Sequence, residues 1–274
     1  MKKIFNLRGG RKLTLGEKTL VMGVLNVTPD SFSDGGKFFA PEDAINHAVQ
    51  LVADGADILD LGAESTRPNA KPISADEEFS RLEKVLPALI NLGVPISIDT
   101  YKPEVAAQAL EFGADIINDI CGLENLRMID VVKKFSAPVI AVHNERCCEC
   151  GIVCDVKKFF RRTIANCAAH DYDTTQIIFD PGIGFGKTFD DDVELLRRLD
   201  ELKTLDGEEI PVMFGVSRKR IVGTLTGLDV DERDAATGAL CLHAIERGID
   251  IVRVHNVKMI SPICRMTDKL SKEK

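Results

Sequence analysis

The stretch 95–119, PISIDTYKPEVAAQALEFGADIIND, shows in one place the pattern that runs through the chain. A short β-branched run is followed by a segment with helical apolar spacing that begins at Pro103. Gly113 then stands where a left-handed C-cap is needed before the next apolar run. We therefore predict two strands, over 95–100 and 116–119, joined by a helix over 103–112.

The same alternation of apolar run, polar turn and helical segment recurs toward both ends of the chain. The predicted strands cover 20–27, 57–63, 95–100, 116–119, 138–143, 177–181, 212–217 and 251–255. The predicted helices cover 41–54, 75–92, 103–112, 125–135, 155–171, 189–204, 232–247 and 257–271. Consecutive βα units without a Pro/Ser-rich linker predict an α/β fold, a single (β/α)8 TIM barrel over 1–274. An open dinucleotide-binding sheet is disfavoured, because no G-x-G-x-x-G follows the first strand.

Composition excludes several classes of partner. The 274 residues are 45% hydrophobic and 28% charged, which is enough to bury a large core, and the formal net charge of −8 includes no basic block. A nucleic acid or an anionic membrane is therefore not expected as the main partner, and a small molecule is. The start, MKKIFNLRGGRKL, lacks a signal-like apolar run, and no stretch reaches the roughly 20 apolar residues of a membrane span. We predict a cytoplasmic protein.

Four of the eight cysteines crowd one segment of the sequence, at Cys147, Cys148, Cys150 and Cys154. Zinc or an iron–sulfur cluster uses such ligands, usually with a second pair elsewhere, and no distant CxxC is present. A reduced, cysteine-rich loop is the other interpretation, since thiols in a long chain without a secretory segment normally stay reduced. Both interpretations remain open at this point.

Polar residues end all the predicted strands, at the edge where a barrel builds its active site. In chain order these are Asn26, Glu64, Asp99, Asn118 with Asp119, His143, Asp180, the run SRKR at 217–220, and Arg253 with His255. A single Asp or Asn of this kind is commonly a turn or cap residue. Their occurrence on every strand predicts a polar site.

The candidate residues fall into two chemical groups. Two carboxylates, an amide and an ammonium suit a flat heterocycle that alternates donors and acceptors, such as a 2-amino-4-oxo pyrimidine edge. This first group is Asp99, Asn118, Asp180 and Lys219. The second group is an anion clamp, because guanidinium groups bind phosphate oxygens in a bidentate manner and imidazole adds a donor. Its members are Asn26, Arg67, Arg253 and His255.

The segment DPGIGFGKT at 180–188 ends like a phosphate-binding P-loop, but its spacing does not fit one. The first glycine of that motif would fall on Pro181, so a nucleotide triphosphatase is excluded. We expect the glycines to let this loop pass close to a planar ligand, which Phe185 could cover.

Seven segments together resemble the dihydropteroate synthase family. They are VMGVLNVTPDSFSDGG at 21–36, ESTRPNA at 64–70, IDTYKPEVA at 98–106, IIND at 116–119, DPGIGFGKT at 180–188, SRKR at 217–220 and VRVHNV at 252–257. The first of them is a specific loop signature, and the others follow in the order of the family. The resemblance spans nearly the whole chain and implies a pterin-binding TIM barrel.

The resemblance implies a transferase that joins 6-hydroxymethyl-7,8-dihydropterin pyrophosphate to 4-aminobenzoate and releases pyrophosphate. The first group above would bind the pterin ring and the second the pyrophosphate, with Asn26 also a ligand of Mg²⁺. The aminobenzoate would be framed by Thr66, Pro68, Phe185 and Arg220. The implied catalytic residues are Asn26, Asp99, Lys219, Arg253 and His255. A homodimer formed through the outer helices is implied as well.

The implied mechanism is dissociative: the C–O bond to pyrophosphate breaks, and the arylamine attacks a pterin methylene cation. Loops 28–39 and 65–72 would close over the site and exclude water.

Two residues of this chain depart from the pattern of the family. Arg220 replaces a serine of many relatives, and either pairs with the aminobenzoate carboxylate or points to solvent. Val142 stands where a methionine is expected against the pterin.

Three rival functions follow from the same residues. A barrel that presents methyltetrahydrofolate to a corrinoid protein would also use Asp and Asn at strand ends, but would not need NVTPDSFSDGG or the pair of Arg253 and His255. A pterin-binding paralogue without turnover and a synthase that uses a modified arylamine are the other two.

Overall fold

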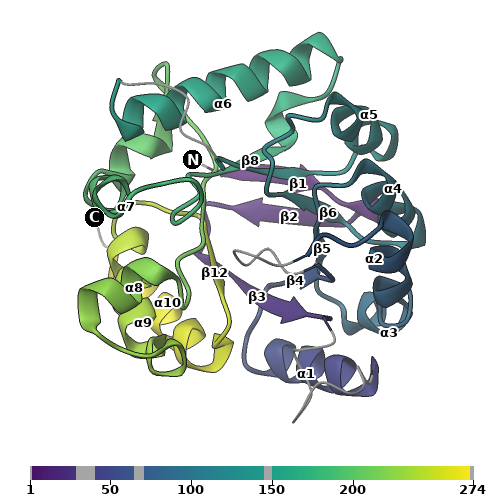
Figure 1. Ribbon diagram of the computed structural model, residues 1–274, viewed down its shortest axis with the longest axis horizontal. Helices are drawn as coiled ribbons and strands as arrows, with labels where there is room; N and C mark the ends of the chain where they lie inside the picture. The colour runs from purple at the N-terminus through teal and green to yellow at the C-terminus, as the bar shows by residue number, and fades with distance from the viewer. Residues whose placement is uncertain (1, 29–40, 65–70, 145–149, 272–274) are drawn as a thin grey trace.

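The computed structural model describes residues 2–28, 41–64, 71–144 and 150–271 (Figure 1). Within these ranges, eight parallel strands form one sheet in the order β11-β12-β3-β4-β5-β6-β7-β8. They are β3 (Leu20–Asn26), β4 (Ile58–Gly62), β5 (Ile96–Asp99), β6 (Ile116–Asp119), β7 (Val139–Val142), β8 (Ile177–Asp180), β11 (Met213–Phe214) and β12 (Ile251–Val254). The two outer strands meet where Phe179 pairs in parallel with Val212, which closes the sheet into a barrel. The predicted (β/α)8 barrel is confirmed.

Helices follow the strands and pack around the outside of the barrel (Figure 1). They are α1 (Pro41–Ala53), α2 (Ala75–Leu82), α3 (Leu86–Leu89), α4 (Pro103–Phe112), α5 (Leu126–Phe135), α6 (Ile152–Ala169), α7 (Phe189–Arg197), α8 (Arg220–Thr226), α9 (Asp234–Ile245) and α10 (Val257–Ser271). A large apolar cluster fills the space between strands and helices, with Leu59, Ile98 and Val139 among its buried members.

Three predicted helices differ from the observed ones. The prediction of one helix over 75–92 was wrong: it breaks into α2, α3 and a 3-10 turn, because Pro87 lacks an N–H and its ring opposes a continuous helix. The helix predicted over 155–171 begins earlier, at Ile152, directly after Gly151 with φ +86°. The helix predicted over 189–204 ends at Arg197 and continues as a 3-10 segment. Helix α8 was not predicted.

The barrel interior is apolar in its lower part, toward the amino ends of the strands. Because alternate residues of a strand face opposite sides, one residue in two points inward. The inward-facing apolar side chains form a second cluster, which includes Met22, Ile58, Ile116, Ile140, Ile178, Met213 and Ile251.

An N-terminal hairpin that the sequence analysis did not predict closes the amino end of the barrel. Strands β1 (Lys3–Asn6) and β2 (Lys12–Leu15) pair antiparallel. Phe5, Leu7, Leu13 and Leu15 of this hairpin segment belong to the same cluster as the barrel interior. The backbone N–H of Asn6 also donates to Gln176 Oε1 at 3.0 Å, next to β8. The hairpin therefore acts as an apolar plug.

The helices of the described ranges differ from membrane-spanning helices in length or composition. None of them has both the length and the apolar character that a bilayer crossing requires.

Phe5→Ala should destabilise the protein by about 3–5 kcal/mol, because it empties a fully buried position under the barrel. Ile4→Ala is the matched control on the same strand, since Ile4 is 46% exposed and should change stability by less than about 0.5 kcal/mol. Urea unfolding followed by circular dichroism measures both. Equal effects of the two substitutions would contradict the plug.

Candidate active site

A polar layer lies above the apolar part of the interior, at the carboxyl ends of the strands. Asn26, Gly62, Asp99 and Asn118 stand in register on the neighbouring strands β3, β4, β5 and β6. Asp180 ends β8 and is buried, like Asn118. The strand ends thus bring together residues that lie far apart in the sequence, as predicted.

Arg253 on β12 is at the centre of this layer. Its Nε donates to Asp60 Oδ2 at 2.6 Å, and its Nη2 donates to Asp99 Oδ2 at 2.7 Å. Asp60 Oδ2 also accepts from Asn118 Nδ2 at 3.1 Å. The two predicted groups are therefore not separate, because the guanidinium expected in the anion clamp is bonded directly to Asp99 of the heterocycle group and is linked to Asn118 of that group through Asp60.

Lys219 and Asp180 lie on the side of the loop that follows β8. Lys219 Nζ donates to the Ile183 carbonyl oxygen at 2.5 Å and lies 4.3 Å from the centroid of the Phe185 ring. Asp180 Oδ1 accepts from the backbone N–H of Gly182 at 2.7 Å. Phe185 is thus placed over the ammonium group, next to the predicted ring site.

Burial shifts the pKa values of the charged groups in this layer. It raises the pKa of Asp99 to about 7, although the positive charge of Arg253 acts in the opposite direction. Burial also raises the pKa of Asp180, against the attraction of Lys219. It lowers the pKa of Lys219 to about 8, and Asp180 partly offsets that effect. Such shifts are typical of functional sites, where charges are held in a dry environment.

Several acceptors in this layer and in the row directly beneath it have no hydrogen-bond partner among the described residues. These buried atoms are the Oδ1 atoms of Asp60, Asp99 and Asn118 and the Oγ of Ser97. A buried acceptor without a donor costs about 1–3 kcal/mol. A ligand that carries amino or ring N–H groups would supply such donors.

Two inward-facing glycines leave out side chains next to other oxygens of this layer. A Cβ on Gly62 would lie 3.6 Å from Asn26 Oδ1 and 3.8 Å from Asp99 Oδ2. A Cβ on Gly215 would lie 3.5 Å from Asp180 Oδ2. Glycine within a strand commonly marks such a close approach.

His255 follows β12 and is held by Ser217. Its Nδ1 lies 2.9 Å from Ser217 Oγ, and its backbone N–H donates to the same oxygen at 3.2 Å. This contact fixes the orientation of the imidazole at the barrel mouth.

Three of the predicted strand-end residues have structural contacts instead. Glu64 accepts hydrogen bonds from Tyr101 and Lys102. Asp119 accepts from the backbone N–H groups of the turn that follows β6. His143 is buried, with its Nε2 3.5 Å from Asp155 Oδ2 on α6.

Several predicted residues lie outside the described ranges. They are Thr66, Arg67 and Pro68, together with Cys147, Cys148 and most of loops 28–39 and 65–72. In the part of the chain that is described, no three His, Cys, Asp or Glu side chains are grouped as metal ligands would be. A metal at the cysteine segment therefore stays untested.

Arg220 begins α8 and is exposed at the rim of the barrel mouth. Its Nη2 donates to the Lys187 carbonyl oxygen at 3.4 Å. This contact places it beside the 180–188 loop and decides neither of the two roles considered for it.

Asp60 is the site residue that the sequence analysis missed. It lies within a strand, not at its end, so the criterion of polar strand ends passed over it. The available signal was a carboxylate inside the otherwise apolar segment ILDLG at 58–62. Asp and Glu are almost never fully buried unless they are paired.

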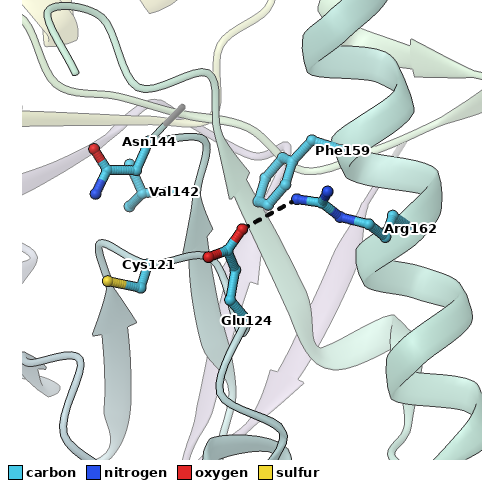
Figure 2. Close-up of a pocket in the computed structure, with 6 residues that line it drawn as sticks. All are labelled: Cys121, Glu124, Val142, Asn144, Phe159 and Arg162. Atoms are coloured by element: carbon cyan, nitrogen blue, oxygen red, sulfur yellow. Dashed lines mark hydrogen bonds and ion pairs between the residues drawn. The ribbon is translucent and has the colours of Figure 1, made fainter. Parts of the chain in front are cut away.

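A cavity of about 270 Å³ lies beside the barrel mouth (Figure 2). Its lining comes from the turn after β6, from the end of β7 and from α6, and consists of Cys121, Glu124, Val142, Asn144, Phe159 and Arg162. Glu124 and Arg162 form an ion pair of 3.3 Å across it. Val142, the expected pterin-side residue, is shared by this cavity and the barrel interior. The cavity therefore adjoins the barrel interior at Val142 and is separate from the charged layer.

Lys187 holds the 180–188 loop together. It is buried, and its Nζ donates to the carbonyl oxygens of His143, Gly182 and Phe185 at 2.9, 2.8 and 3.0 Å. A Cβ on Gly182 would meet the His143 carbonyl oxygen at 1.9 Å, so only glycine fits there. This close approach is to the backbone of His143, and the approach of the loop to a planar ligand stays a prediction. Lys187 fixes the loop that carries Phe185, and does not act as a P-loop lysine.

Comparison with known proteins agrees with this site. The model of the family described as pterin binding enzyme matches residues 22–255, so the chain belongs to the pterin-binding enzymes. It is 43% identical over 262 residues to the dihydropteroate synthase of Bacillus subtilis, covering 94% of this chain and 90% of that protein. This degree of identity and coverage places the chain among the dihydropteroate synthases.

Two solved structures show the same architecture. Xanthomonas albilineans dihydropteroate synthase with 4-aminobenzoic acid has a TM-score of 0.92 and 36% identity, with 100% of both chains covered. Burkholderia cenocepacia dihydropteroate synthase complexed with 7,8-dihydropteroate has a TM-score of 0.88 and 37% identity, covering 99% of this chain and 98% of that one.

Lys187→Met should destabilise the protein by about 3 kcal/mol, because it leaves buried carbonyl oxygens without a donor. Lys84→Met is the control, since Lys84 is exposed on the outer surface and its substitution should cost less than about 0.5 kcal/mol. Chemical denaturation of both variants checks this. A stability unchanged from the parent protein would show that the loop does not depend on the ammonium group.

Proposed function

We propose that this protein condenses 6-hydroxymethyl-7,8-dihydropterin pyrophosphate with 4-aminobenzoate to give 7,8-dihydropteroate and pyrophosphate. The observation that carries the proposal is the position of Arg253, which bonds Asp99 in the row that holds Asn118 and bonds Asp60 directly beneath that row. One site thus offers acceptors for a heterocycle and a cation for its anionic substituent.

The pterin ring would be held by Asp99, Asn118, Asp180 and Lys219. The unpartnered Oδ1 atoms of Asp99 and Asn118 support this role, since the amino and ring N–H groups of a pterin are donors. Lys219 offers N–H donors to the ring oxygen or nitrogens. Phe185 near the ammonium would cover one side of the site.

The pyrophosphate would be held by Asn26, Arg67, Arg253 and His255. Arg253 supports the role because Asp60 and Asp99 engage its Nε and Nη2, and a guanidinium carries further N–H donors. The contact with Ser217 fixes the orientation of the His255 imidazole before the substrate binds.

The chemical step would be a substitution at the pterin methylene carbon. The C–O bond breaks and its electron pair leaves with pyrophosphate, so a cation conjugated with the ring remains. The arylamine nitrogen donates its lone pair to that carbon and then loses a proton to solvent or pyrophosphate. Asp99 would stabilise the cation, while Arg253 and His255 stabilise the departing charge.

Magnesium fits the donor set at the barrel mouth, with Asn26 as the proposed protein ligand. Mg²⁺ commonly binds few protein oxygens and completes its octahedron with phosphate oxygens and water. The carboxamide oxygen of Asn26 supports this, because it lies beside the space over Gly62. When bound, the ion would neutralise charge on the diphosphate.

The aminobenzoate would be framed by Thr66, Pro68, Phe185 and Arg220. The position of Arg220 at the rim supports a contact with the carboxylate of this substrate.

We also propose that residues 1–274 form one domain, which acts as a homodimer in the cytoplasm. The hairpin packed into the barrel supports a single domain. Leu225, Val230 and Leu242 in the region of α8 and α9 are exposed, and this apolar surface supports an interface with a second copy of the chain. The free thiols of Cys121, Cys150, Cys154, Cys167, Cys241 and Cys264 support a reducing compartment.

Incubation with the pterin pyrophosphate and 4-aminobenzoate should yield dihydropteroate, and removal of Mg²⁺ with a chelator should strongly reduce the rate. Chromatographic detection of product with and without added Mg²⁺ measures this. Pterin binding without product would point instead to a non-catalytic paralogue, to a modified arylamine, or to a methyl-carrier protein. Full activity in the presence of the chelator would show that the reaction does not depend on Mg²⁺.

The pH profile should report Lys219. Its ammonium is charged below the lowered pKa of about 8 and becomes neutral as the pH rises through that value. We expect kcat/KM for the pterin pyrophosphate to fall on the alkaline side with a midpoint near that pKa, because this ratio reports the free enzyme. In Lys219→Arg the activity should be lower, but this alkaline limb should vanish, since guanidinium stays protonated. An unchanged limb in that variant would assign the titration to another group.

A further inference from the structure

Asp60 is a buried carboxylate in the middle of a strand. It is 0% exposed and has the apolar Leu59 and Leu61 on either side. Its strand position is two residues before Gly62, so it lies one inward-facing layer beneath the row that holds Asp99 and Asn118. A charge in such a place is retained only if it is paired.

One oxygen of Asp60 makes both of its hydrogen bonds. Oδ2 accepts from Arg253 Nε at 2.6 Å and from Asn118 Nδ2 at 3.1 Å. With Nη2 of Arg253 bonded to Asp99, the planar guanidinium is fixed at two of its nitrogens. Its orientation toward the barrel mouth is therefore determined.

The same contact decides which end of the Asn118 carboxamide faces the site. The NH2 group points to Asp60, so the unpartnered Oδ1 is the atom left for a ligand. If Asp60 were neutral, the amide could turn over and present a donor in place of an acceptor.

We infer that Asp60 is a positioning residue that orients the Arg253 guanidinium and the Asn118 carboxamide, and so couples pyrophosphate binding to pterin binding. The inference rests on the proposed function, which assigns those two ligands. Asp60 itself lies below the ligand layer and acts through its two partners. Residues that orient metal ligands act in the same indirect way, and their substitution typically changes affinity or activity by about 10- to 100-fold.

Asp60→Asn tests the inference with little change of volume. We expect the Kd of 6-hydroxymethylpterin and the Kd of inorganic pyrophosphate, measured separately by calorimetry, each to rise at least about 10-fold. The matched control is Asp115→Asn, because Asp115 is also buried on the barrel wall and pairs with Arg11 at 2.6 Å away from the site. That variant should lose stability and keep both Kd values.

A double-mutant cycle separates positioning from general damage. If Asp60 acts on pyrophosphate through Arg253, then Asp60→Asn should add little to the loss caused by Arg253→Lys, because the lysine has no Nε to be oriented. Additive losses, or an Asp60→Asn variant with unchanged Kd values, would overturn the inference. These readouts need no turnover, so they remain decisive even if the parent protein forms no dihydropteroate.

The parent protein offers a test that does not depend on folding of Asp60→Asn. The Arg253 Nε–H resonance, assigned by its loss in Arg253→Lys, should be shifted downfield and exchange slowly with water, as expected for a buried bond of this length. A resonance that exchanges at the rate of exposed arginines would also overturn the inference.

Discussion

The ion pairs of Arg253 are the interaction on which the site depends. An unpaired carboxylate inside a barrel costs several kcal/mol, and here two carboxylates, Asp60 and Asp99, share one guanidinium. The pairing lets both remain in the interior and fixes the position of Arg253. Removing one partner of such a buried group typically costs about 3–5 kcal/mol, so stability and site geometry rest on the same contacts.

Different parts of the barrel interior serve stability and the geometry of the site. Its lower part is apolar and is sealed by the side chains of the hairpin, which leaves the upper part free to hold charges. In that upper part Gly62 and Gly215 remove side chains where the polar groups converge.

The sequence alone predicted the barrel, the order of its strands along the chain and most of the residues at its mouth. These were accessible because apolar periodicity marks a strand and the carboxyl ends of parallel strands share one edge. Register was not accessible, so the role of Asp60 and the union of both groups at Arg253 emerged only from the structure. Strand-end position also gave false candidates, since Glu64 and His143 turn toward helices and loops.

The closure of the barrel has a consequence for how the protein folds. Leu20 on β3 pairs with Ile251 on β12, although they lie near opposite ends of the sequence. Contacts of such long range form slowly, because the loop-closure entropy must be overcome first. Arg253 belongs to that last strand, so Asp60 is without its counter-ion in any intermediate that lacks β12. During synthesis on the ribosome, the charges of the site can therefore be neutralised only when nearly the whole chain has emerged, and a truncated barrel would carry a buried acid that opposes its own compaction.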